Sequence, residues 1–173
     1  MLFFAYVEIL CLTHNDDFKI KKQVRGEDKN ADPSERDMSI LVRNVLSLSP
    51  QVAPTKVGII PYGQSNDVAG ARDLMTALVE TDMATLIDNT SASIGKKYSK
   101  FDEIGVPFVV TLDDDTPKDG TVTLRHRDSE EQVRLPKADV LGIVTAVCKQ
   151  GKSWEDTCSK FPLVRKAESP RRF

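Results

Sequence analysis

The stretch from Lys56 to Asp88 constrains the fold most, because its pattern is that of a strand, a helix and a second strand. Residues 56–61 (KVGIIP) form a short apolar run with β-branched residues, which is typical of a strand covered on both faces. After Asn66 or Asp67, either of which can cap a helix, apolar residues recur at helical spacing. Residues 84–88 (ATLID) then indicate a second strand. A length of about thirty residues suits a βαβ unit, so we expect two parallel strands joined by a right-handed crossover.

The remaining residues continue this α/β pattern. Residues 107–113 (PFVVTLD) are apolar enough for a central strand, and residues 121–125 (TVTLR) alternate as a hairpin partner with one wetter face would. The other predicted elements are a helix after Ser93, an edge strand at 131–135, a helix from Pro136 that ends before Gly151, and a short helix at 153–160. The sequence therefore predicts one α/β domain.

The amino-terminal part of the chain has a different character. Residues 19–36 are mostly charged and are interrupted by Gly26 and Pro33, which indicates a loop or linker. Residues 38–45 fit a helix and an extended segment equally well, and we leave both open. The predicted organisation is an amino-terminal extension or linker at 1–45 that is partly flexible, one domain at 46–164, and a basic carboxy-terminal tail at 165–173.

Charge and cysteine content exclude several classes of protein. A net charge of -2 argues against a chain that coats nucleic acid nonspecifically, so any nucleic-acid contact must be local. The three cysteines, Cys11, Cys148 and Cys158, form no Cys-x-x-Cys pair, so we expect neither a disulfide scaffold nor a zinc site. We expect the protein to work in a reducing compartment. Residues 1–12 are apolar but contain Glu8 and are too short to span a bilayer, so we expect no membrane contact there. A buried strand or a fragment of a longer protein's core are the two interpretations of this segment.

No self-contained active site is visible in the sequence. It has no nucleophile elbow, no Gly-x-Gly-x-x-Gly motif and no Walker lysine. The triplet Asp113, Asp114 and Asp115 could hold magnesium, but Pro117 and Gly120 follow it as they would in a solvated hairpin, so we expect no metal. Two basic clusters remain, 96–100 and 125–127, and each is either a solvated face or a nucleic-acid contact.

Four separate segments together form a recognisable pattern. They are LSLSPQVAPTKVGIIP at 46–61, SASIGKKYSKFDEIGVPFVVTLD at 91–113, TVTLRHRDSEEQVR at 121–134 and WEDTCSKFPL at 154–163. In this order they resemble the carboxy-terminal anticodon-binding domain of class II glycyl-tRNA synthetases. The general α/β pattern is shared with prolyl, threonyl and histidyl relatives, and the Arg-His-Arg-Asp-Ser stretch favours glycyl. The resemblance implies a three-layer α/β/α domain with a mixed five-stranded sheet flanked by helices.

The resemblance also implies a ligand, the anticodon loop of tRNA(Gly), with Lys96 and Arg127 expected to touch it. Guanidinium and amide groups can read the edges of unstacked bases, so we place Arg125, Arg127 and Gln132 on one wet sheet face. Lys97 and Lys100 would contact phosphates. The predicted anticodon-binding residues are thus Lys96, Lys97, Lys100, Arg125, Arg127 and Gln132.

Two acidic residues also bear on which contacts this predicted site can make with RNA. The family often carries an aromatic or other residue where Asp114 stands, and an acid there would repel phosphate. Asp128 is expected to orient Arg125 or Arg127 instead of touching RNA.

The catalytic motifs of class II synthetases have no counterpart in residues 1–45. A catalytic domain needs on the order of 200 residues, so we expect this chain to be inactive alone and to carry no cofactor. ATP and magnesium would act in the catalytic domain of a homodimeric parent enzyme in the cytoplasm or mitochondria. Two hypotheses follow: a domain or fragment that supports ATP-dependent glycylation of tRNA(Gly), or a stand-alone accessory module that binds RNA or protein.

Overall fold

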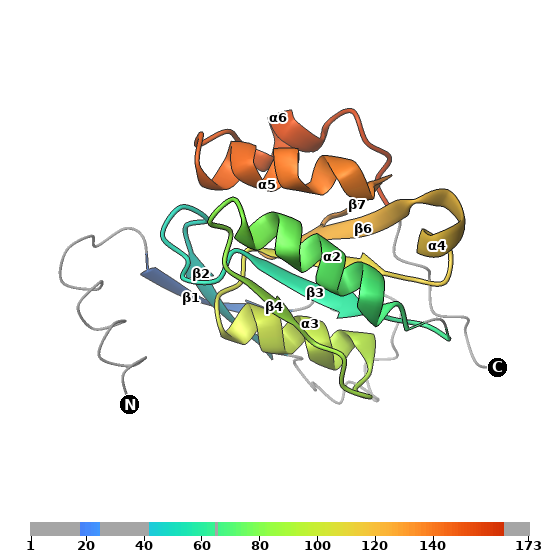
Figure 1. The fold of residues 1–173 in the computed structure, drawn as a ribbon. Helices are drawn as coiled ribbons and strands as arrows, with labels where there is room; N and C mark the ends of the chain where they lie inside the picture. Colours follow the sequence, from blue (N-terminus) through green and yellow to red (C-terminus); the bar gives the residue numbers. More distant parts are fainter. Residues whose placement is uncertain (1–17, 25–41, 65, 165–173) are drawn as a thin grey trace.

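The computed structural model of this protein describes residues 18–24, 42–64 and 66–164. Its main body is a mixed five-stranded sheet with helices on both faces (Figure 1). A two-stranded antiparallel sheet precedes it along the chain, formed by β1 (Phe18–Val24) and β2 (Val42–Leu48). The predicted α/β class and the mixed five-stranded sheet are confirmed.

The strands of the main sheet follow the order β4-β3-β5-β6-β7. The first strand, β3 (Val57–Pro61), pairs in parallel with β4 (Thr85–Ile87) and β5 (Phe108–Leu112). β6 (Thr121–His126) then runs antiparallel to β5, and β7 (Gln132–Pro136) runs antiparallel to β6. The parallel pair and the hairpin are those that the sequence predicts.

The helices divide between the two faces of this sheet. α2 (Val68–Val79) begins where the Asp67 carboxylate accepts a hydrogen bond from the Gly70 amide, which is one of the two predicted caps. Figure 1 shows α2 and the two carboxy-terminal helices on one face and α3 on the other. The remaining helical elements are α3 (Ile94–Glu103), the short α4 (Thr116–Asp119), a 3-10 turn (Lys137–Asp139), α5 (Val140–Cys148) and α6 (Trp154–Cys158).

Side chains alternate across the strands and so build two cores. The larger core lies between the sheet and the helices α2, α5 and α6, and contains Ile59 and Val110 with their neighbours. The smaller core lies under α3 and consists of buried Ile60, Phe101, Val106 and Val109. The second face is therefore covered by α3, which also contacts β2.

The structure corrects part of the amino-terminal prediction. Residues 18–24 form a strand, although the sequence predicts a loop or linker from residue 19 to 36, and Phe18 pairs with Leu48 at one end of its register. Of the segment at 38–45, for which a helix and an extended conformation were both left open, residues 42–45 are extended in β2, and residues 38–41 lie outside the described residues. The apolar segment at 1–12, the rest of the charged segment and the tail at 165–173 lie outside the described residues.

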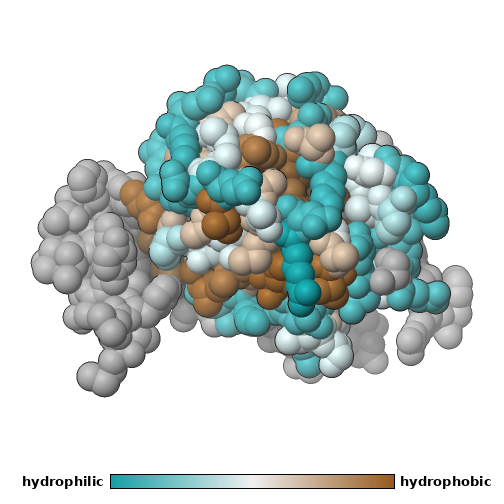
Figure 2. All heavy atoms as spheres, in the orientation of Figure 1, coloured by the Kyte–Doolittle hydropathy of each residue, from teal (hydrophilic) through white to brown (hydrophobic). Residues whose placement is uncertain are grey.

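Figure 2 shows mostly hydrophilic atoms with some apolar ones among them in this view. Two exposed apolar residues belong to the β4 side of the domain, Leu86 of β4 at 45% exposure and Val79 at the end of α2 at 49%. Across the part of the chain that the structure describes, the helices are too short or too polar for any of them to cross a membrane.

Gly58 allows α3 to approach the sheet, and this generates a stability prediction. A Cβ added at residue 58 would lie 2.8 Å from ring atoms of Phe101, which is only 1% exposed and cannot move aside easily. We expect Gly58→Ala to lower the free energy of unfolding by about 1 to 3 kcal/mol, measured by urea denaturation. The matched control is Gly142→Ala in α5, where a Cβ meets nothing within 4 Å, and it should stabilise by up to about 1 kcal/mol. Equal effects of the two substitutions would contradict the close approach.

Candidate nucleic-acid interface

A polar crevice lies at the carboxyl ends of β3 and β4. Because the two strands are parallel, the loops that follow them meet at the same edge of the sheet, and they then diverge to α2 on one face and α3 on the other. The cavity between them has a volume of about 520 Å³. The residues lining it are Pro61, Tyr62, Gly63, Gln64, Asn66, Asn89, Thr90, Ser91, Ala92, Lys97 and Asp114.

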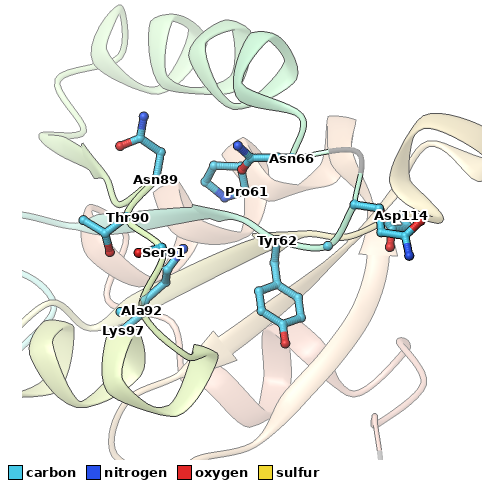
Figure 3. Close-up of a pocket in the computed structure, with 11 residues that line it drawn as sticks. Pro61, Tyr62, Asn66, Asn89, Thr90, Ser91, Ala92, Lys97 and Asp114 are labelled. Carbon is cyan, nitrogen blue, oxygen red and sulfur yellow. The ribbon is translucent and has the colours of Figure 1, made fainter.

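The crevice combines one aromatic ring with neutral polar groups. Tyr62 is 43% exposed, and Figure 3 shows it between Asp114 on one side and Asn89 and Thr90 on the other. Five of the other lining residues end in amides or hydroxyls: Gln64, Asn66, Asn89, Thr90 and Ser91. Such groups can donate to and accept from the edges of unstacked bases, while an exposed aromatic ring can stack on their faces. The arrangement is therefore suited to single-stranded nucleic acid.

A buried carboxylate holds the loop after β4 against α3. The side chain of Asp88 is 3% exposed; its Oδ1 accepts from the Thr90 amide at 3.0 Å and the Thr90 hydroxyl at 2.6 Å, and its Oδ2 accepts from Lys100 Nζ at 2.9 Å. The Asp88 carbonyl also accepts from Lys97 Nζ at 3.2 Å. Burial alone raises the pKa of Asp88, but the hydrogen bonds from Thr90 and Lys100 outweigh it and lower this pKa to about 2.

The three predicted lysines of α3 differ in exposure. Lys96 is exposed on the outer surface of the helix. Lys97 is only 3% exposed, and its amine is engaged within the fold, although its side chain lines the crevice. The Lys100 side chain is 59% exposed while bonding to Asp88. Two of the three can therefore meet a ligand at the surface without any change of structure.

Arg125 attaches α3 to the sheet. It is 3% exposed, and its guanidinium donates two hydrogen bonds to the Asp102 carboxylate, at 2.9 and 3.2 Å. It also lies over the ring of Tyr98, 4.8 Å from the centroid, and the Tyr98 hydroxyl is 2.9 Å from Thr111 Oγ1. The charge of Arg125 is thus satisfied inside the domain.

Arg127 ties together three segments at the end of β6. It is 1% exposed and donates to the carbonyls of Gly105 at 2.8 Å and Leu48 at 2.6 Å. Its guanidinium also pairs with Asp128 at 2.8 Å, and Asp128 accepts a 2.7 Å hydrogen bond from Ser47. Asp128 thus orients Arg127, one of the two arginines that the sequence suggested for it.

The prediction that Arg125, Arg127 and Gln132 share a solvent-exposed sheet face is wrong. Both arginines are buried, and Gln132 is half-buried. Gln132 pairs with Arg125 across β6 and β7, and Arg125 pairs with Val109 near the start of β5. This is the end of the sheet opposite the crevice. The six predicted residues therefore divide into two groups, with the lysines on the crevice side and the other three away from it.

Sequence reasoning missed the polar residues that follow the two parallel strands. Tyr62 and Gln64 come directly after β3, and Asn89 and Thr90 come directly after β4. The signal was available, since carboxyl ends of neighbouring parallel strands meet and commonly form binding sites in α/β folds. The predicted site relied mainly on charged residues instead of these neutral polar ones.

The Asp triplet is also divided by the structure. Asp113 pairs with Arg134, and Asp115 accepts from Lys118 at 3.0 Å, while Asp114 lines the crevice. In the described ranges, no group of three His, Cys, Asp or Glu side chains could hold a metal ion.

The burial of Arg127 generates a prediction on stability. Arg127→Ala removes the donor of two buried carbonyls and leaves Asp128 with Ser47 but without its ion-pair partner, so we expect the free energy of unfolding to fall by about 3 kcal/mol or more. Chemical denaturation measures this fall. Lys160→Ala, an exposed position, should change stability by less than about 0.5 kcal/mol. An Arg127→Ala protein with the wild-type midpoint would show that these contacts do not hold the fold.

The low pKa of Asp88 predicts an acid-dependent loss of stability. The folded pKa is about 2 and the unfolded value is 3.8, so the carboxylate stabilises the protein fully above the unfolded value and loses this effect as the pH falls toward 2. We expect a contribution of about 2 kcal/mol that is absent from Asp88→Asn. Denaturation curves between about pH 2 and pH 6 should show the two proteins converging at the acid end. A constant difference across this range would contradict the assignment.

Comparisons with known proteins agree with this geometry. A family described as "Anticodon binding domain" matches residues 56–146. The glycine–tRNA ligase of Bombyx mori is 42% identical over 129 residues, which are 73% of this chain and 18% of that relative. The mitochondrial glycine–tRNA ligase 1 of Saccharomyces cerevisiae is 40% identical over 129 residues, 73% of this chain and 19% of the relative. The glycine–tRNA ligase of Treponema denticola is 37% identical over 110 residues, 64% of this chain and 24% of the relative.

This chain thus spans between 18% and 24% of the length of these three relatives. The matched segment contains the crevice-lining residues and the whole of the main sheet. The resemblance to glycyl-tRNA synthetases drawn from the sequence motifs is confirmed, and the chain belongs to the anticodon-binding domain family.

Proposed function

We propose that this chain recognises the anticodon loop of a glycine tRNA, as the tRNA-reading part of a glycine–tRNA ligase. The observation that carries the proposal is the crevice, where an exposed tyrosine lies among neutral amides and hydroxyls in a domain of the anticodon-binding family. Anticodon bases are single-stranded and can be splayed out, so they fit a site of this chemistry.

Stacking on Tyr62 supplies affinity at this site. Tyr62 is 43% exposed and lines the crevice, so a base can stack on its ring. Asn66 and Asn89 are exposed in the adjoining loops, and each amide offers both donors and an acceptor to a base edge. Stacking holds a base in place, and the amides read which base it is.

Contacts with the RNA backbone come from exposed lysines of α3. Lys96 and the exposed part of Lys100 lie on the helix that forms one wall of the crevice, so they contact phosphates of the bound loop. Arg125, Arg127 and Gln132 act from the opposite end of the sheet. We infer that the two arginines support binding by holding α3 and its neighbouring loops, and that Gln132 contributes at most at the margin of the site.

Glycylation itself belongs to the parent enzyme. The relatives named as glycine–tRNA ligases are several times longer than the matched region, so ATP and magnesium would act in a catalytic domain joined to this one. That domain and a second subunit are the proposed protein partners. A location in the cytoplasm or the mitochondrion fits, and one relative is named as mitochondrial.

A stand-alone accessory module that binds protein is the second candidate function. The exposed Leu86 on the edge strand β4 and the exposed Val79 of α2 favour it, because they offer apolar surface to a partner. The two functions differ in what they require of Tyr62, since only tRNA recognition depends on the crevice.

Substitution of Tyr62 tests the proposed function. The full chain should protect the anticodon nucleotides of a glycine tRNA in footprinting at low salt. Tyr62→Ala should weaken binding of an anticodon stem-loop by at least about fivefold, because the loss of a base–aromatic stack costs about 1 to 3 kcal/mol. Tyr62→Phe should keep most of the affinity, since the ring remains.

Leu86→Ala is the matched control, because it removes an equally exposed apolar side chain outside the crevice. It should leave RNA affinity unchanged. Absence of any anticodon protection by the wild-type chain would refute tRNA recognition by this chain, and a loss caused by Leu86→Ala but not by Tyr62→Ala would move the site to β4.

A further inference from the structure

We propose that Asp114 is a specificity-determining residue that selects cytidine over uridine at one position of the bound loop. This inference rests on the proposed function, since it requires that the crevice hold anticodon bases. It concerns a residue that the sequence pattern marked only as an unfavourable charge.

The two neighbours of Asp114 are engaged in ion pairs outside the crevice. Asp113 accepts from Arg134 of β7, and Asp115 accepts from Lys118 of α4. Asp114 belongs to the crevice lining, and Figure 3 shows it facing the loop that carries Tyr62. The loop after β5 therefore places one acid of the triplet at the binding surface.

Gly63 brings this carboxylate close to the stacking residue. Gly63 has a φ of +98°, and a Cβ built there would lie 2.6 Å from carboxylate atoms of Asp114. The loop backbone therefore passes directly against Asp114, and Tyr62 is the residue just before the contact. A base stacked on Tyr62 would present its edge near an acceptor whose position is limited by the packing of this loop. An ionised carboxylate has about four acceptor sites, so one carboxylate can bond within the protein and to a ligand at the same time.

The chemistry of a carboxylate decides which base edge it favours. An ionised carboxylate only accepts hydrogen bonds, so it repels phosphate and pairs with N–H donors. Cytosine presents an amino group at C4, whereas uracil presents a carbonyl oxygen there. Uracil in the same place would bring two acceptors together. Among pyrimidines, Asp114 therefore favours cytidine, which is the base that glycine anticodons use to pair with the guanosines of glycine codons.

Lys97 does not cancel this selectivity. It is the other charged residue of the crevice lining, but it is 3% exposed and its amine donates to the Asp88 carbonyl. Lys118 also acts electrostatically on Asp114, but it is not among the lining residues and pairs with Asp115. The remaining lining groups are neutral and can pair with either pyrimidine.

Paired RNAs that differ at one base test the inference. The full-length chain is titrated with anticodon stem-loops in which one anticodon cytidine at a time is replaced by uridine, at one fixed salt concentration. Wild-type protein should prefer cytidine by about tenfold or more at one position. Asp114→Asn should reduce that preference at least about fivefold, because an amide offers both a donor and an acceptor. Asp115→Asn, which changes the adjacent acid outside the crevice, should keep the preference.

Each other outcome is decisive. An unchanged preference in Asp114→Asn overturns the inference. Equal tightening of all RNAs with a stronger salt dependence also overturns it, because that result would show that Asp114 only repels phosphate. Wild-type binding without any preference for cytidine contradicts this inference alone. Wild-type failure to bind any of the stem-loops is instead the failure of the proposed function. Thermal unfolding of both variants shows that the fold is retained, as expected at two exposed positions.

Discussion

The attachment of α3 to the open face of the sheet is the interaction on which the rest of the structure depends. Phe101 packs against the strand at Gly58, where any side chain would collide with its ring, and Asp102 next to it forms a buried two-bond ion pair with Arg125. Burying two charges is costly unless their geometry is good, so this pair fixes the helix in one place. Because a helix is rigid, fixing its carboxy-terminal half also places its first turn, with Lys97, at the wall of the crevice.

The two ends of the main sheet differ in what their polar side chains do. At the amino end of β5, Arg127 and Asp128 join β2, the loop before β5 and β6, and their charges are used within the fold. At the carboxyl ends of β3 and β4, polar side chains such as Asn89 are exposed in loops. This separation places the buried contacts of Arg127 away from the crevice, while on the crevice side Asp88 holds the loop after β4 through Thr90 and Lys100.

Patterns that depend on near neighbours in sequence were predictable. The spacing of apolar residues predicted a helix after Asn66 or Asp67 and a central strand at 107–113, and the structure has α2 after Asp67 and β5 at 108–112. A half-buried or fully buried element shows its period locally. The roles of Arg125 and Arg127 were not predictable, since charged residues are usually exposed and their partners lie far away in the chain. Strand β1 was also not predicted, because β2, the strand with which it pairs, follows only after a long connection. Crevice residues such as Tyr62 were missed because loops show no period.

The mild acidity of the chain bears on how such a crevice can recognise RNA. With a net charge of -2, long-range attraction contributes little, so we expect affinity to come from short-range contacts, namely stacking, hydrogen bonds and the phosphate contacts proposed for α3. An acid at the site lowers affinity for every phosphate that approaches it, and this loss is useful only if the same group distinguishes between bases. Specificity is a difference between two affinities, and a group that repels the wrong base increases it as surely as one that attracts the right base. Asp114 beside Tyr62 has the geometry for such discrimination.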